Sequence, residues 1–158
     1  MPTHPRDFYV DYVKRAYDEW LALPLDEYRA KGATHQANVM ADRVWDFFRT
    51  SEPAKVFNCT SPNAYRKALA ARECPDFALV WKLDDAFKHA TLTRGRPQVT
   101  SADQTGIGQR GYGEGGYGEG MYGGGEEMLI ELNDGTKSPL TAVMSKVIAM
   151  WERLVATF

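Results

Sequence analysis

The sequence is poor in the features that mark secreted and membrane-spanning proteins. Its 158 residues include two cysteines, Cys59 and Cys74, which form no CxxC pair, so we expect two free structural thiols rather than a disulfide. No apolar run approaches the roughly 18 residues that a bilayer span needs. The N-terminus also lacks the apolar core of a signal peptide. We therefore expect a cytoplasmic protein that forms one domain over residues 1–158 and makes no membrane contact.

Positive charge is not in excess either. The formal net charge is −2 and the pI is about 5.9, which argues against a general phosphate-binding surface. A local excess of basic residues in the middle third precedes a Tyr-rich segment, and such interleaving can hold single-stranded nucleic acid. Solvated helix faces explain these charges equally well, so nucleic acid is a weak alternative partner. The basic residues are Arg66, Lys67, Arg72, Lys82, Lys88, Arg94 and Arg96.

Recognised metal and cofactor motifs are missing as well. The three histidines, His4, His35 and His89, are scattered, and none has HxxxH or HExxH spacing. The sequence G-I-G-Q-R-G at 106–111 has the spacing of a dinucleotide fingerprint. It neither follows a hydrophobic strand nor opens a helix, so its context fails. We expect no metal and no cofactor.

Glycine, by contrast, is concentrated in one segment. Of the 14 glycines, 11 lie between Gly106 and Gly125, and residues 111–125 repeat as GYGEG, GYGEG, MYGGG. Such a segment cannot bury enough apolar surface to offset its own ordering entropy. It is either a disordered insertion or a contact element whose tyrosines, Tyr112, Tyr117 and Tyr122, bind a partner or a second copy. We treat 106–125 as an insertion in the domain.

The remaining pattern is mainly helical. Apolar residues at helical spacing predict helices over 6–22, 25–50, 62–73, 75–93 and 139–156, with Gly32 as a weak point in the second. Strands are predicted near 97–104 and 127–132, and Asn133-Asp134-Gly135 is a strong turn signal. We expect a four- or five-helix bundle that carries a β-hairpin with a long Gly-rich tip.

Two helices carry polar residues that could meet. His35, Asn38 and Asp42 share one face of the second helix, beside its apolar stripe. The later helix carries the i,i+4 pairs Asp84/Lys88 and Asp85/His89. If the two helices pack together, a histidine oriented by a carboxylate could act as a general base, with a lysine stabilising an anion. The alternative is a polar network or a set of ion pairs that fixes helix register. The predicted catalytic residues are His35, Asp85, Lys88 and His89, and the predicted binding residues are Asn38, Asp42 and the three repeat tyrosines.

Two resemblances bear on origin and activity. The stretches THQANVMADRVW (34–45) and LDDAFKHATL (83–92) are similar to uncharacterised helical proteins of bacteria and their phages, which implies a phage or mobile-element origin but no activity. The helical order also resembles HEPN-type bundles, many of which are ribonucleases with an Arg-x4–6-His motif. Arg29 and His35 have that spacing, on the second helix.

These features favour binding or assembly over turnover. The chain lacks a strong catalytic signature and has one conspicuous contact element, so a protein partner or self-association is the leading prediction. The alternative is an enzyme, either a HEPN-like metal-independent ribonuclease or a nucleotide-binding enzyme.

Overall fold

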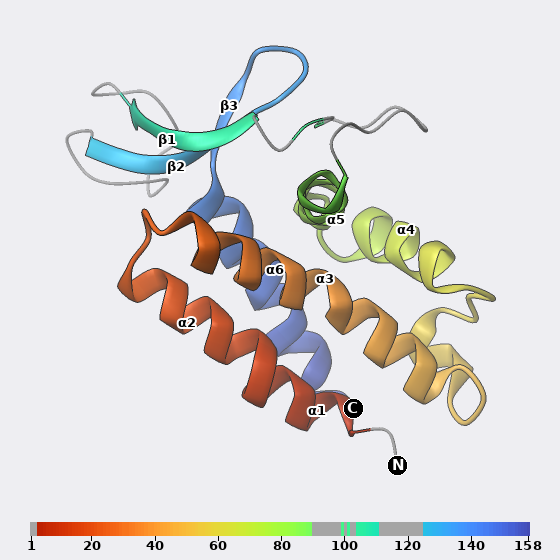
Figure 1. Ribbon diagram of the computed structural model, residues 1–158. Coiled ribbons are helices and arrows are strands. Elements are labelled where there is room, and N and C mark those ends of the chain that lie inside the picture. The colour runs from red at the N-terminus through yellow and green to blue at the C-terminus, as the bar shows by residue number, and fades with distance from the viewer. Residues whose placement is uncertain (1–2, 90–98, 100, 102–103, 111–124) are drawn as a thin grey trace.

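The computed structural model describes residues 3–89, 99, 101, 104–110 and 125–158. As the sequence predicts, the chain is mainly helical with a small antiparallel sheet (Figure 1). The helices are α1 (Pro5–Phe8), α2 (Arg15–Ala22), α3 (Glu27–Phe48), α4 (Pro62–Arg72), α5 (Asp76–Lys88) and α6 (Leu140–Val155). A π-helix η1 (Tyr9–Lys14) joins α1 to α2, and a 3-10 turn η2 (Pro53–Val56) precedes α4. The strands are β1 (Thr105–Arg110), β2 (Gly125–Glu131) and β3 (Lys137–Pro139).

Helix starts follow local capping signals. The Asp26 carboxylate accepts a hydrogen bond from the Arg29 backbone N–H (3.1 Å), and the Ser61 hydroxyl accepts one from the Ala64 N–H (3.1 Å). Pro62 follows Ser61 at the first helical position, where its missing N–H costs nothing. Gly32, the predicted weak point of the second helix, does not interrupt it, because α3 continues through this residue. The buried stripe of small residues on α3 holds that segment against the core.

The first predicted strand is also wrong in position. Of residues 97–104, only Val99, Ser101 and Gln104 are described, and none of them lies in a strand. The strand β1 lies instead at Thr105–Arg110, within the segment assigned to the insertion. It pairs antiparallel with β2, from Thr105 opposite Ile130 to Arg110 opposite Gly125. Glycine disfavours strands when taken alone, but pairing with the apolar β2 overrides that preference here.

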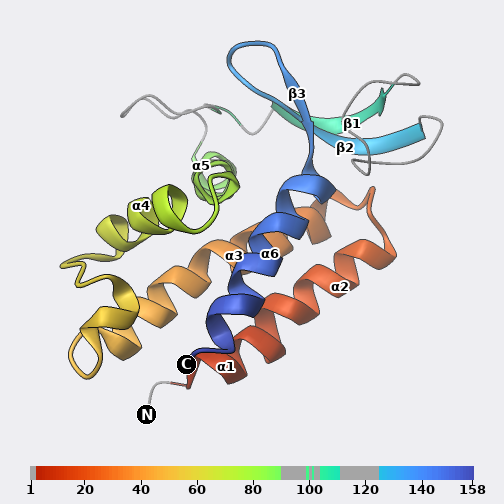
Figure 2. The same cartoon turned by 180° about the vertical axis from the view of Figure 1, so that it is seen from behind.

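The sheet has the order β1–β2–β3. The predicted turn at 133–135 is confirmed: Gly135 adopts a positive φ of 85°, and the Asp134 carboxylate accepts from the Thr136 N–H (2.9 Å). This turn returns the chain as β3, which pairs with β2 and runs directly into α6. The strand β3 is not among the elements predicted from the sequence, and its last residue, Pro139, falls at the start of the predicted helix 139–156. In Figures 1 and 2 the sheet lies beyond the helices, at the end where α6 begins.

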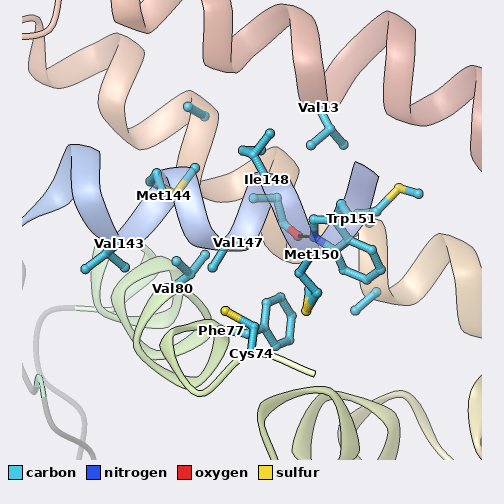
Figure 3. Packing of buried hydrophobic residues seen from close by; sticks show 14 of the residues in the cluster. Val13, Cys74, Phe77, Val80, Val143, Met144, Val147, Ile148, Met150 and Trp151 are labelled. Carbon is cyan, nitrogen blue, oxygen red and sulfur yellow. Dashed lines mark hydrogen bonds between the residues drawn. The ribbon is translucent and has the colours of Figure 1, made fainter. Parts of the chain in front are cut away.

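The core forms around α6. Its apolar stripe faces α3, α5 and η1, and Figure 3 shows Val80 and Phe77 of α5 on one side of it and Val13 of η1 on the other. Trp151 is fully buried, stacks edge-to-face on Phe77 (5.8 Å between ring centroids) and donates its indole N–H to the Ala37 carbonyl oxygen (2.9 Å). The final helix therefore packs against α3, α5 and η1 and supplies much of the core between them.

The two ends of the described chain meet. The Arg6 guanidinium Nε donates to the Val155 carbonyl oxygen at 3.2 Å, and α1 lies beside the C-terminal end of α6 in Figure 2. In the part of the chain that the structure describes, no helix is both long enough and apolar enough to cross a membrane.

Candidate functional site

A polar network lies where α3, α4 and α5 meet. His35 and Asn38 come from one face of α3, and Asp84 and Lys88 come from successive turns of α5. Arg66 joins them from α4. The two polar helix faces therefore meet as predicted. The carboxylate that bonds His35 is Asp84, however, and not Asp85, which was predicted to be catalytic.

Asp84 is the centre of the network. Its side chain is only 3% exposed, and its carboxylate accepts three hydrogen bonds. The donors are His35 Nδ1 (3.1 Å to Oδ1), Asn38 Nδ2 (2.7 Å to Oδ2) and Lys88 Nζ (2.7 Å to Oδ2). A buried carboxylate is costly unless it is paired and fully hydrogen-bonded. These three donors supply that compensation.

The carboxylate also sets the tautomer of His35. An ionised carboxylate can only accept, so Nδ1 carries the hydrogen and the neutral ring keeps its lone pair on Nε2. The His35 side chain is 43% exposed, and its Nε2 has no hydrogen-bond partner among the described residues. The arrangement is a histidine oriented by a carboxylate, with a basic nitrogen directed away from it.

The network continues from Asn38 to Arg66. The Asn38 amide oxygen accepts from Arg66 Nε (2.9 Å), and Arg66 Nη2 donates to the Asp42 carboxylate (2.6 Å). The buried guanidinium also lies over the Trp81 ring, 5.6 Å from its centroid. Asn38 and Asp42, which were predicted to bind a ligand, are thus engaged within the protein. Arg66 was missed, although its position three residues before the buried Leu69 indicates an inward-facing side chain.

Two of the predicted catalytic residues lie outside this network. Asp85 pairs with Lys82 (4.0 Å), and His89 is exposed at the end of α5, where its backbone N–H donates to the Asp85 carbonyl oxygen (3.1 Å). The two side chains make no hydrogen bond with each other. Asp84 could have been chosen from the sequence, because it lies seven residues after Phe77 and four after Val80, both buried.

The Arg29–His35 pair is not assembled as a site. The Arg29 guanidinium donates to the Glu19 carbonyl oxygen (3.3 Å) and pairs with Asp26 (3.3 Å). Both contacts lie at the start of α3, whereas His35 faces α5. The ribonuclease resemblance therefore gains no geometric support from this motif.

The basic residues of the middle third are mostly engaged. Arg66, Lys82 and Lys88 pair with carboxylates, and Arg72 lies over the Phe57 ring (5.0 Å). Arg94, Arg96 and the repeat tyrosines Tyr112, Tyr117 and Tyr122 lie outside the described residues.

Cys59 and Cys74 are free thiols, as predicted. Burial raises the pKa of the Cys74 thiol. It is therefore a weakly reactive group that packs in the core.

Comparison with family models, with curated proteins and with solved structures gives no match for this chain. Function is therefore inferred from the chain's own residues.

Proposed function

We propose that this protein acts by binding and self-assembly, with the β1–β2 hairpin and the Gly/Tyr segment between its strands as the contact element. The observation that carries the proposal is the outer edge of β1. Within the part of the chain that is described, β1 pairs with β2 on one side and with no strand on the other. An edge of this kind offers unpaired backbone groups to a further strand.

The composition of β1 supports this role. Proteins protect open edges with lysine, proline or an inward-facing charge, but Thr105–Arg110 contains no lysine or proline and its only charged residue is the last one. Ile107 is 49% exposed in the middle of the strand. A strand laid beside β1 would cover this apolar side chain.

A second copy of the chain is the partner that fits. In an antiparallel pair, residues whose backbone groups face outward must lie opposite one another. A two-fold axis through Ile107 meets this condition, placing Ile107 opposite its own copy, Gly106 opposite Gly108, and Thr105 opposite Gln109. No like charges face each other in this register. The contact is isologous, so it closes as a dimer.

The Gly/Tyr segment extends this contact. It joins Arg110 to Gly125, which pair at the end of the hairpin. Its tyrosines Tyr112, Tyr117 and Tyr122 supply contact area at low entropic cost, and its glycines let the backbone approach a partner closely. The connection with phages or mobile elements stays a prediction.

The test is the molar mass of the protein in solution, measured by light scattering after size exclusion over a range of concentrations. We expect the intact chain to be a dimer and Ile107→Lys to be a monomer, because a charge at the centre of the edge would face its own copy. Tyr28→Lys, at an exposed aromatic residue of α3, is the matched control and should remain a dimer.

A further variant distinguishes the contribution of the β1 edge from that of the Gly/Tyr segment. Replacing residues 111–124 with Asn-Gly joins Arg110 to Gly125 through a two-residue turn that suits a hairpin. A dimer that persists in this variant and dissociates in Ile107→Lys would assign the contact to β1 alone. An intact chain that is monomeric at every concentration, or an Ile107→Lys variant that stays dimeric, would refute self-pairing through β1.

A further inference from the structure

We infer that His35 and Lys88 form a binding site for a small phosphate-type oxyanion, which His35 holds by taking up a proton at Nε2. This site is separate from the proposed assembly edge, since it lies on α3 and α5 rather than on the sheet. Three properties of the network favour an anion here: the fixed orientation of the His35 ring, the exposed N–H donors of Lys88 and the local charge.

The ring of His35 is already positioned. Asp84 holds Nδ1 at 3.1 Å, and Asp84 is itself fixed by the buried amide of Asn38. Asn38 is fixed in turn by the buried guanidinium of Arg66. A ligand at Nε2 therefore meets a group whose orientation costs little to maintain.

Lys88 has further N–H donors besides the one that bonds Asp84. Its ammonium group uses one N–H on Asp84 and is 45% exposed, so further N–H groups can reach a ligand beside the imidazole. Lys31 lies one turn before His35 on α3, with its Nζ 5.4 Å from the centroid of the Phe87 ring. Lys31 therefore lies near the C-terminal end of α5, which also carries Lys88.

The local charge favours an anion. Among the described residues, Asp84 is the one carboxylate bonded to His35. Lys88 offsets its charge, and Lys31 adds a positive charge near the same end of α5. The neighbouring carboxylates are already paired, Asp42 with Arg66 and Asp85 with Lys82. An anion at Nε2 would thus lie near the Lys88 ammonium group, with these neighbouring carboxylates already paired.

The tautomer of His35 favours anions that carry a proton over anions that do not. Nε2 of neutral His35 bears a lone pair, so an anion that brings its own proton can transfer it to the ring. Dihydrogen phosphate loses one proton to Nε2, which leaves hydrogen phosphate opposite an imidazolium that then donates Nε2–H back to it. Atoms and charge balance in this step, and no covalent bond to phosphorus changes. Sulfate has no proton to give near neutral pH and should bind more weakly.

The test is an NMR titration of the histidine ring nitrogens with inorganic phosphate at fixed pH and ionic strength. In the free protein we expect the Nδ1–H tautomer at His35. Added phosphate should shift Nε2 of His35 saturably, while exposed His89 serves as an internal reference that does not saturate. Sulfate at the same ionic strength should give a weaker response.

Two lysine variants make the result specific. Lys88→Gln removes one charge-assisted donor, and we expect phosphate to bind about tenfold more weakly. Lys14→Gln, in η1 and paired with Asp18 away from the α3–α5 contact, should bind as the parent does. An Nε2–H tautomer in the free protein, equal responses of His35 and His89, or equal effects of the two variants would overturn the proposal and leave the network a purely structural one.

Discussion

Asp84 and Asp85 are adjacent in the sequence, yet their carboxylates lie in different environments. Asp84 is buried and accepts from His35, Asn38 and Lys88, whereas Asp85 is half-buried beside Lys82. One residue along a helix rotates a side chain by about 100°, which here separates the interior of the α3–α5 contact from its rim.

Replacing each aspartate with asparagine should separate their roles. Asp84→Asn places an amide N–H₂ among three donors, and we expect the free energy of unfolding to fall by about 2 kcal/mol. Asp85→Asn should change it by less than about 0.5 kcal/mol, as is usual at the surface. Urea denaturation of the two variants measures the difference. Equal effects would mean that the Asp84 network does not stabilise the fold.

Tyr9 shows the opposite situation, a buried polar group without compensation. Its hydroxyl is buried in η1 and has no hydrogen-bond partner among the described residues. Removing an uncompensated hydroxyl relieves its desolvation cost. We expect Tyr9→Phe to raise the free energy of unfolding at pH 7 by about 1 kcal/mol. Tyr12→Phe, at an exposed ring in the same element, is the control and should be neutral. A loss of stability in Tyr9→Phe would show that the hydroxyl has a partner, such as a bound water.

At the scale of elements, β1 is the part of the fold that its own sequence least favours. It carries glycines at 106 and 108 and depends on β2 for its pairing. The two glycines differ in their surroundings. A Cβ at Gly108 would lie 2.7 Å from Leu129 Cδ1, and a Cβ at Gly106 would meet nothing within 4 Å.

This difference predicts unequal effects of alanine. Gly108→Ala should lower the free energy of unfolding by about 1 kcal/mol, since the buried Leu129 must move. Gly106→Ala should be neutral or stabilise by up to about 1 kcal/mol, through the lower entropy of the unfolded chain. Amide hydrogen exchange in β1 and β2, together with urea denaturation, would detect both changes. A Gly106→Ala effect as large as that of Gly108→Ala would show that backbone freedom, not side-chain space, decides both positions.

At the scale of the whole molecule, buried tyrosines couple stability to alkaline pH. Burial, with smaller effects of Glu152, Asp18 and Tyr17, raises the pKa of Tyr9 to about 12. Burial also raises the pKa of Tyr17 and of Tyr65. A phenol is neutral when protonated, and in the unfolded chain it loses its proton near pH 10.

The sign of the effect follows from proton binding. Between about pH 10 and 12 the folded chain retains protons that the unfolded chain has released, so the free energy of unfolding falls as pH rises. Below about pH 9 these tyrosines are protonated in both states, so they do not make the free energy of unfolding depend on pH. We expect Tyr9→Phe to make the fall between pH 10 and 11 shallower, measured by urea denaturation at each pH. An unchanged slope in that variant would show that Tyr9 does not titrate differently in the two states.

Much of the helical architecture could be predicted because its signals are local. The Asp26 and Ser61 caps, the Asn133–Gly135 turn and the apolar stripe of α6 each depend on residues a few positions apart. The strand β1 could not be located in this way. Its glycines disfavour extended structure locally, and its stability comes from pairing with residues 15 to 25 positions away in the sequence.

The candidate site likewise has features that the sequence predicts and features that only the folded structure decides. The sequence by itself determined that His35 and Asn38 share one helix face and that Asp84 and Lys88 share another, because the helical period fixes which residues are neighbours. Only the tertiary structure decided that Asp84 rather than Asp85 meets His35, and that Arg66 completes the network from a third helix. Which residues meet across helices depends on the rotation of each helix about its axis, and that rotation is set by the burial of the whole core around α6.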